Sequence, residues 1–79
     1  MKISLVIMTR NEIFGLKRIF DQIPMHAVDE VFAVDGNSTD GTVEFLKEKG
    51  IKVIGQTRPG RGEAFRVAFK EAQGDALII

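Results

Sequence analysis

Short apolar segments alternate with amphipathic segments along this chain, and no other feature limits the possible fold as strongly. Four apolar runs have the length of a buried strand, at residues 3–8, 31–34, 51–54 and 76–79. Three segments with helical spacing lie between them, at residues 12–23, about 40–49 and 63–73. Strands and helices that alternate with short connections are typical of right-handed crossovers on a parallel sheet. The sequence therefore predicts a doubly wound, three-layer α/β domain of the order βαβαβαβ.

Several polar residues and glycines fall where these helices are expected to begin or end. We expect Asn11 to cap the first helix, and Thr39 or Asp40 to cap the second. Gly50 and Gly74 are expected to end the second and third helices, since glycine tolerates the left-handed conformation that often follows a helix.

The composition excludes several classes of protein. Seventy-nine residues suffice for one small domain, which we assign to residues 1–79. The formal net charge of zero argues against a nucleic-acid binder or a polybasic membrane surface. The chain has no cysteine and one histidine, so disulfides and thiolate or multi-histidine metal sites are excluded. The apolar stretch at residues 3–8 is too short for a signal peptide or a transmembrane segment, so we expect a cytoplasmic protein.

Three polar segments follow three of the predicted strands directly. They are "TRNE" at 9–12, "DGNSTDG" at 35–41 and "TRPGRG" at 57–62. In open parallel sheets, ligands bind outside the carboxyl ends of the strands, near the point where the strand order reverses. The three loops are therefore expected to converge on one edge of the sheet and to form a ligand site there.

The segment "DGNSTDG" admits two interpretations of similar weight, turn formation and ligand binding. Its Asp, Asn, Ser and Gly residues are those that form turns and cap helices. A P-loop is excluded because Thr42 stands where the lysine is required. A calcium loop is excluded because Asp40 occupies the glycine position and Leu46 the position of the bidentate glutamate.

The segment "PGRGEAF" contains two glycines but does not form a dinucleotide-binding motif. Phe65 stands where the third glycine is required, and the segment follows the third predicted strand rather than the first. Arg61, between two glycines and before a helix, is a candidate for binding an anion. The alternative, of equal weight, is a flexible loop with a solvated arginine.

Taken together, "LVIMTRNE", "VDGNSTDGT" and "RPGRGEAFRVAF" resemble the successive motifs of inverting family 2 glycosyltransferases. The resemblance covers essentially the whole chain and is greatest to the polyprenyl-phosphate (dolichol-phosphate) mannosyltransferase and glucosyltransferase branch. It implies the Rossmann-like N-terminal half of a GT-A fold. It also implies a nucleotide-sugar donor, either GDP-mannose or a UDP-hexose, whose sugar is transferred with inversion to a polyprenyl phosphate or a glycan.

The resemblance also assigns nucleotide-binding residues. It implies that Thr9, Arg10 and Glu12 line the base and ribose pocket, and that Arg61 lies near the base and the phosphates. Asp35 corresponds to the first residue of the family's acidic pair.

The chain departs from the family at the second residue of that acidic pair. Gly36 stands where the second aspartate normally contacts the base, and we name Asn37 as its substitute. Asp40 is expected to stabilise the loop.

The resemblance further implies a divalent cation, Mg²⁺ or Mn²⁺, held by an Asp-x-Asp motif that follows the segment corresponding to "GDALII". We expect the chain to be truncated before that motif, so that its residues include no metal ligand and no catalytic residue. The fourth strand would then form an edge of the sheet. Exposed apolar edges pair with other chains, so we expect a homo-oligomer through residues 76–79.

Two rival functions remain open at this point. One is a non-catalytic interaction module with a degenerate sugar-nucleotide site, which Gly36 and the missing Asp-x-Asp favour and the other motifs disfavour. The other is a nucleotidyltransferase of similar fold. It ranks lower because "MTRNE" contains no glycine-rich phosphate loop.

Overall fold

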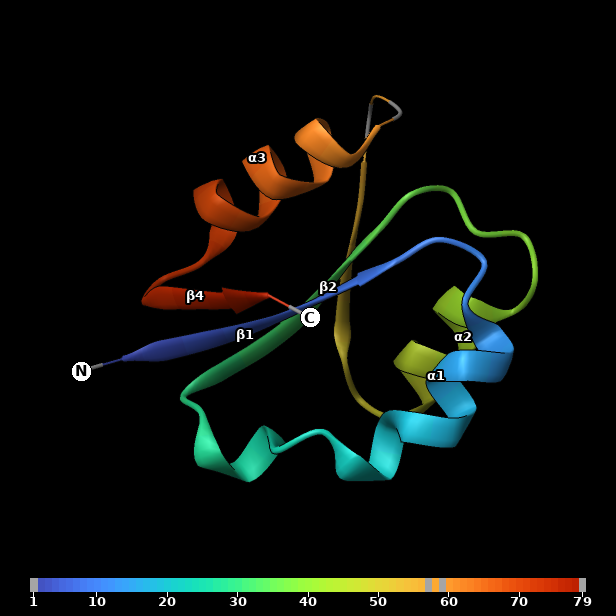
Figure 1. Ribbon diagram of the computed structural model, residues 1–79, viewed down its shortest axis with the longest axis horizontal. Coiled ribbons are helices and arrows are strands. Elements are labelled where there is room, and N and C mark those ends of the chain that lie inside the picture. Colours follow the sequence, from blue (N-terminus) through green and yellow to red (C-terminus); the bar gives the residue numbers. More distant parts are fainter. Residues whose placement is uncertain (1, 57, 59, 79) are drawn as a thin grey trace.

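The protein, described by a computed structural model for residues 2–56, 58 and 60–78, forms a four-stranded parallel sheet with helices on both faces (Figure 1). The strands are β1 (Ile3–Thr9), β2 (Glu30–Asp35), β3 (Lys52–Gly55) and β4 (Asp75–Ile78). The α-helices are α1 (Ile13–Ile19), α2 (Thr42–Glu48) and α3 (Arg61–Glu71), with short 3₁₀ turns η1 (Phe20–Gln22) and η2 (Met25–Ala27) between α1 and β2. The predicted α/β order is therefore confirmed.

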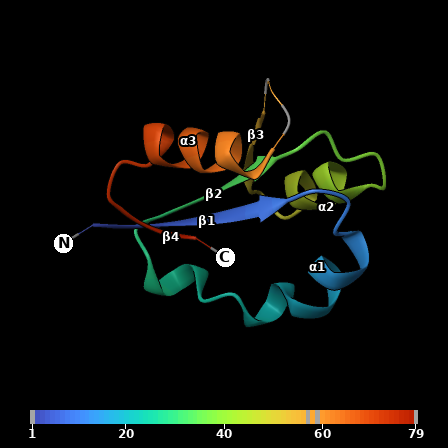
Figure 2. The same ribbon diagram turned by 45° about the horizontal axis from the view of Figure 1, so that its top comes forward.

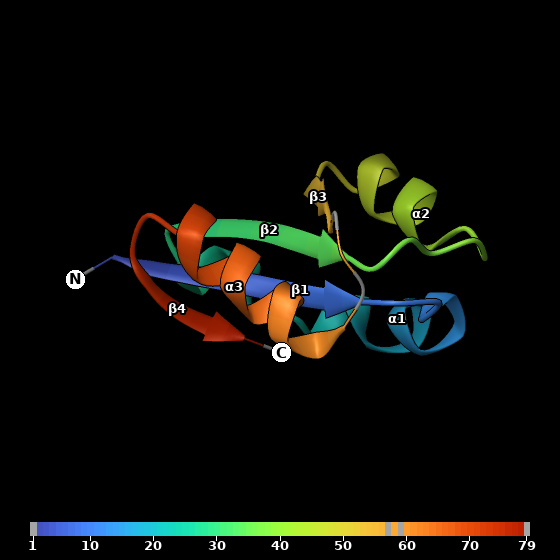
Figure 3. The same cartoon turned by 90° about the horizontal axis from the view of Figure 1, so that it is seen from above.

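The order of the strands in the sheet is β3-β2-β1-β4, and each neighbouring pair is parallel (Figure 3). The chain moves outward from β1 through β2 to β3, and then returns across the sheet to place β4 on the other side of β1. The strand order therefore reverses at β1, and the crevice beyond the carboxyl ends of the strands is the expected place for a ligand.

Two apolar cores explain why the strands read as nearly continuous apolar runs. One face of the sheet packs against α1 and α2, and the other packs against α3. Figure 2 shows α3 and α1 on opposite sides of the sheet. Along β1, Leu5 belongs to the first core and Val6 to the second, because successive side chains point to opposite faces. Strands of a parallel sheet that are covered on both faces need apolar side chains on both.

The first helix is shorter than predicted. It ends at Ile19 rather than Ile23, and the chain continues as the turn η1. Ile23 is extended, with ψ of 124°, as expected for a residue that precedes proline. Asn11 does not cap this helix: it has a positive φ of 51°, and the amide of Ile13 instead donates to the carboxylate of Asp40, at 3.1 Å.

The other helix ends partly match the expectations. Gly50 has a left-handed φ of 78° after α2, which confirms its predicted role. Gly74 does not end α3 in this way, because the helix stops at Glu71 and Ala72 is already extended. Gly74 is instead required for close packing, since a Cβ atom there would lie 2.5 Å from the carbonyl oxygen of Lys2.

Three strand ends lie level with one another, and this register places the polar loops together. Thr9 pairs with Asp35, and Asp35 pairs with Gly55. Backbone hydrogen bonds continue one residue further, from the amide of Gly36 to the carbonyl oxygen of Thr9 and from the amide of Gln56 to the carbonyl oxygen of Asp35, both at 2.9 Å.

None of the helices in the described part of the chain combines the length and apolar character that crossing a membrane requires.

Candidate functional site

A cleft of about 710 Å³ lies at the carboxyl ends of β1 and β2 and beside the start of α3. Residues from all three polar loops line it, as the sequence predicts. Five of the six predicted nucleotide-binding residues are among them: Thr9, Arg10, Glu12, Asn37 and Arg61. The side chains of Val34, Ala64 and Phe65 add an apolar wall on the α3 side of the sheet.

Asp35, the sixth predicted residue, does not line the cleft as the described residues define it. Its side chain is 3% exposed, and both carboxylate oxygens accept hydrogen bonds from neighbouring residues. One oxygen accepts from the hydroxyls of Thr9 at 2.7 Å and Ser38 at 2.6 Å, and the other accepts from the amide of Ser38 at 2.8 Å. Asp35 therefore holds the end of β1 and the loop after β2 in fixed positions.

The loop after β1 and the loop after β2 are joined by a reciprocal pair of hydrogen bonds. The amide of Asn11 donates to the hydroxyl oxygen of Ser38, and the amide of Thr39 donates to the side-chain oxygen of Asn11, both at 2.8 Å. These bonds give hydrogen-bond partners to the backbone amides of Asn11 and Thr39, which lie outside the helices and strands. The wall of the cleft around Arg10 and Asn37 is consequently built from two loops that brace each other.

Asp40 and Thr42 link this loop pair to two helices. Asp40 accepts from the amide of Ile13, the first residue of α1, and from the amide of Thr42, the first residue of α2. The fully buried Thr42 hydroxyl accepts from the amide of Glu12 and donates to Asp40. The hydroxyl of Thr42, followed by these backbone amides, holds the pKa of Asp40 below its ordinary value.

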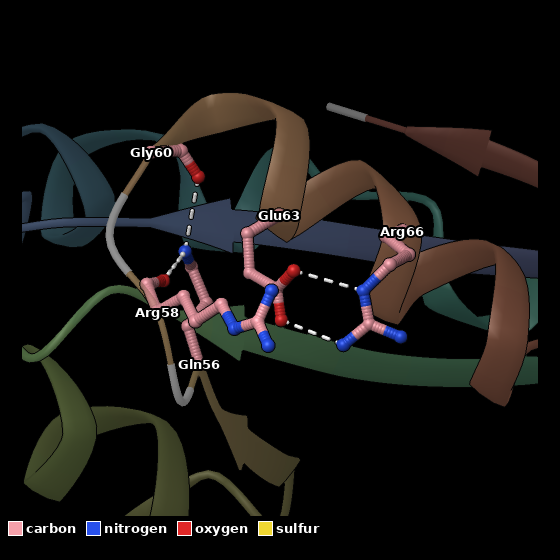
Figure 4. A network of polar contacts seen from close by, with 5 residues as sticks. All are labelled: Gln56, Arg58, Gly60, Glu63 and Arg66. Carbon is pink, nitrogen blue, oxygen red and sulfur yellow. Dashed lines mark hydrogen bonds and ion pairs between the residues drawn. The ribbon is translucent and has the colours of Figure 1, made fainter.

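The third loop is held by the side chain of Gln56 (Figure 4). Its amide nitrogen donates to the carbonyl oxygens of Arg58 at 2.9 Å and Gly60 at 3.0 Å. Glu63 and Arg66, one turn into α3, form a two-pronged ion pair with N···O distances of 2.8 and 2.7 Å. Among residues 2–56, 58 and 60–74 this pair is the only ion pair, so no side chain in these ranges neutralises Arg10, Arg58 or Arg61 at the cleft.

The start of α3 adds backbone donors to these charges. Gly60 precedes the helix with φ of 109° and offers no side-chain cap to it. The first amides of a helix lack partners within the helix and, together with its dipole, favour an anion. Arg58, Arg61 and an uncapped eleven-residue helix therefore make this side of the cleft suitable for phosphate groups.

Comparison with known proteins identifies the family. The sequence model for glycosyl transferase family 2 matches residues 4–79. The chain belongs to glycosyl transferase family 2. Over its full length it is similar to a dolichol-phosphate mannosyltransferase of Pyrococcus furiosus, with 34% identity over 87 aligned positions. An uncharacterized glycosyltransferase of Rickettsia felis is 38% identical to it over 71 residues, or 90% of this chain.

Solved structures of the same class share the fold. Glucosyl-3-phosphoglycerate synthase of Mycobacterium tuberculosis, in complex with Mn²⁺, UDP and glucosyl-3-phosphoglycerate, superposes with a TM-score of 0.86 at 29% identity. The match covers 99% of this chain and 32% of that enzyme. The same enzyme is also known in complex with Mn²⁺ and UDP-glucose. The chain spans about a quarter of the length of the curated family 2 relatives that it matches.

The divalent cation that family 2 membership suggests has no matching ligand set here. Within residues 2–56, 58 and 60–74, no three acidic or histidine side chains lie close enough together to hold a metal ion. Asp35 is not a substitute, since both its oxygens already accept hydrogen bonds from Thr9 and Ser38.

Sequence reasoning missed several residues of this family 2 cleft. Gln56, Arg58 and Phe65 line it but were not named as site residues, although the segment 57–62, which contains Arg58, was predicted to lie there. Asn11 was expected to cap α1, whereas it joins two loops. The position of Gln56, two residues past a predicted strand, is the signal that was present in the sequence.

Proposed function

We propose that this chain is the donor-binding part of a family 2 glycosyltransferase and binds a nucleotide sugar in the cleft at the carboxyl ends of its strands. The donor is GDP-mannose or a UDP-hexose, and the acceptor of the sugar is a polyprenyl phosphate or a glycan. Transfer itself is proposed to need parts of the relatives' length that these 79 residues do not span.

One observation carries this proposal: three loops that are far apart in sequence converge on one cleft with an apolar wall and a cationic side. A nucleoside diphosphate has the matching chemistry, because its base is flat and largely apolar and its phosphates are anionic. The volume of about 710 Å³ lies within the range of about 300–1,000 Å³ that is usual for small-molecule sites.

Each predicted site residue is given a role that its surroundings support. Arg61 and Arg58 lie beside the uncapped start of α3 and neutralise the phosphates. Thr9, Arg10 and Glu12 at the end of β1, with Asn37 opposite them, surround the base and the ribose. Asp35 acts indirectly, through the positions of Thr9 and Ser38.

The roles proposed for these residues include neither metal binding nor acceptor binding. The Mn²⁺ in the complexes of glucosyl-3-phosphoglycerate synthase belongs to that enzyme. We propose that Mg²⁺ or Mn²⁺ takes part in the complete reaction through ligands that this chain does not supply. No acceptor site is assigned to the described residues.

A calorimetric titration tests the proposal. The folded chain is titrated with UDP-glucose and with GDP-mannose, each with and without Mn²⁺, and we expect saturable binding of at least one of them. Because Arg61 is expected to form a charge-assisted contact with phosphate, Arg61→Ala should weaken this binding about tenfold. Arg18→Ala removes an exposed arginine on α1, away from the cleft residues, and should leave the affinity unchanged.

Absence of binding by either nucleotide sugar, in a sample whose circular dichroism shows a folded α/β domain, contradicts the proposal. The three polar loops would then serve to form turns and cap helices, and a non-catalytic interaction module would explain the chain better. Equal loss of affinity in Arg61→Ala and Arg18→Ala would also contradict the proposed site, because it would indicate general electrostatic attraction.

A further inference from the structure

Three residues, each one position past the end of a strand, stand side by side on the floor of the cleft. They are Arg10, Gly36 and Gln56, which follow the paired positions Thr9, Asp35 and Gly55. The middle one has no side chain. A Cβ atom on Gly36 would lie 3.1 Å from Oε1 of Gln56 and 3.7 Å from Cβ of Arg10, so the space that a side chain at 36 would enter already borders the Gln56 amide.

The orientation of that amide is fixed by the loop before α3 (Figure 4). Nε2 of Gln56 donates to two carbonyl oxygens, those of Arg58 and Gly60. Carbonyl oxygens only accept, so the atom that faces them must be the nitrogen, and both of its hydrogens are used. Oε1 therefore points the other way, toward Gly36.

Oε1 of Gln56 is thus a positioned acceptor in the cleft. Within the described part of the chain it accepts no hydrogen bond. An amide oxygen accepts from N–H groups and cannot donate to ring nitrogens that carry a lone pair. Uracil has an N–H at N3 and guanine has one at N1, whereas the corresponding ring nitrogens of cytosine and adenine are acceptors.

We propose that Gln56 determines base specificity in this cleft, with its Oε1 accepting a hydrogen bond from the ring N–H of uracil or guanine above Gly36. The inference rests on the proposed function, since it needs a nucleotide in the cleft. Gly36 supplies the open space and Gln56 supplies the acceptor, so the two positions act as a pair. This assignment differs from the sequence expectation, which gave the role to Asn37.

N-methylated nucleotides test the assignment, because a methyl group replaces the ring N–H and leaves the phosphates unchanged. UDP is compared with N3-methyl-UDP, and GDP with N1-methyl-GDP, by calorimetric titration of the wild-type chain and of Gln56→Met. For the nucleotide that binds, we expect the wild type to prefer the unmethylated form by about tenfold or more. In Gln56→Met the two forms should bind with nearly equal affinity.

Matched variants separate specificity from folding. Gln22→Met makes the same change at an exposed position in η1, and should keep the wild-type preference. Gly36→Ala retains Gln56 but places a methyl group 3.1 Å from its Oε1, and should reduce the preference. This second variant keeps the proposal testable if Gln56→Met does not fold.

Two results would overturn the inference while leaving the proposed function intact. In the first, Gln56→Met weakens both forms in parallel and the preference stays, so that Gln56 only supports the loop. In the second, Asn37→Ala abolishes the preference while Gln56→Met keeps it, so that Asn37 contacts the base. Failure of the wild type to bind either UDP or GDP would instead remove the proposed function, and the inference with it.

Discussion

The carboxylate of Asp35 links two strand ends through three hydrogen bonds, to the Thr9 hydroxyl and to the hydroxyl and amide of Ser38. Resemblance to the family suggested a residue that faces the nucleotide. The structure gives its oxygens other partners, which sequence alone could not specify because Thr9 lies 26 positions away. We therefore propose that Asp35 contributes to binding by holding Thr9 and the loop after β2 in position beside the cleft.

Replacement of Asp35 tests this arrangement. Asp35→Ala leaves the Thr9 hydroxyl and the Ser38 amide without their acceptor, so we expect the free energy of unfolding to fall by about 1–3 kcal/mol. Urea denaturation followed by circular dichroism measures the change. Asp21→Ala, at an exposed position in η1, should change stability little, and an equal loss in both variants would contradict the account.

Acid sensitivity is expected from two carboxylates. A backbone bond from Gln73 and the Ser4 hydroxyl lower the pKa of Glu30 below 4.5, and the Thr42 hydroxyl lowers the pKa of Asp40 below 3.8. Because the unfolded chain then takes up these protons first, stability is fully present above those ordinary values and falls as the pH drops through the lower folded-state values. Urea midpoints between about pH 7 and about pH 3 should show this fall.

The variant Asp40→Asn supplies the control for this pH dependence. It removes one titrating group while keeping a side-chain oxygen near the first amides of α1 and α2. Its stability should therefore depend less steeply on pH below about 4 than that of the wild type. An identical slope in both proteins would show that Asp40 does not contribute to acid sensitivity.

At the scale of the elements, the strands were predicted well and the helix ends less well. Each predicted strand overlaps the observed one, with ends shifted by at most one residue; residue 79, which was predicted to belong to the fourth strand, lies outside the described residues. A strand is visible in its own apolar run. The start of α1, by contrast, is set by Asp40, which lies 27 residues further along and comes close only when β1 and β2 pair.

The two glycines at either end of α3 give a sharp test of packing. Gly74→Ala would bring a methyl group to within 2.5 Å of the Lys2 carbonyl oxygen, where backbone must move, so we expect a loss of about 1–3 kcal/mol. Gly62→Ala enters open space within α3 and should stabilise the protein by about 0.4–1 kcal/mol. Thermal unfolding of both variants would contradict the account if the two shifts had the same sign.

The candidate site was likewise predictable in outline and not in detail. The sequence placed three polar loops at one rim because parallel strands end on the same side, and five predicted residues line the cleft. It did not show that β3 lies beside β2, and only that neighbour relation brings Gln56 next to Gly36. Contacts between strand ends depend on sheet order, which apolar patterning does not encode.

At the scale of the whole molecule, β4 is an edge of the sheet among the described strands, since it pairs only with β1 (Figure 3). An unpaired edge can accept a strand from a second molecule. We therefore predict self-association through residues 76–79, which should appear as a mass that rises with concentration in light scattering coupled to size-exclusion chromatography. A constant monomer mass at high concentration would contradict this prediction.

The central claim is that a nucleotide binds where the three loops converge, and amide NMR spectra of the isotope-labelled chain test it most directly. On titration with UDP and with GDP, we predict saturable shifts for at least one nucleotide, concentrated in residues 8–12, 34–39 and 60–65 and at Gln56. Residues at the opposite ends of the strands, such as Ser4 and Glu30, should shift little. Shifts centred on that opposite end, or no saturable shift with either nucleotide, would contradict the account.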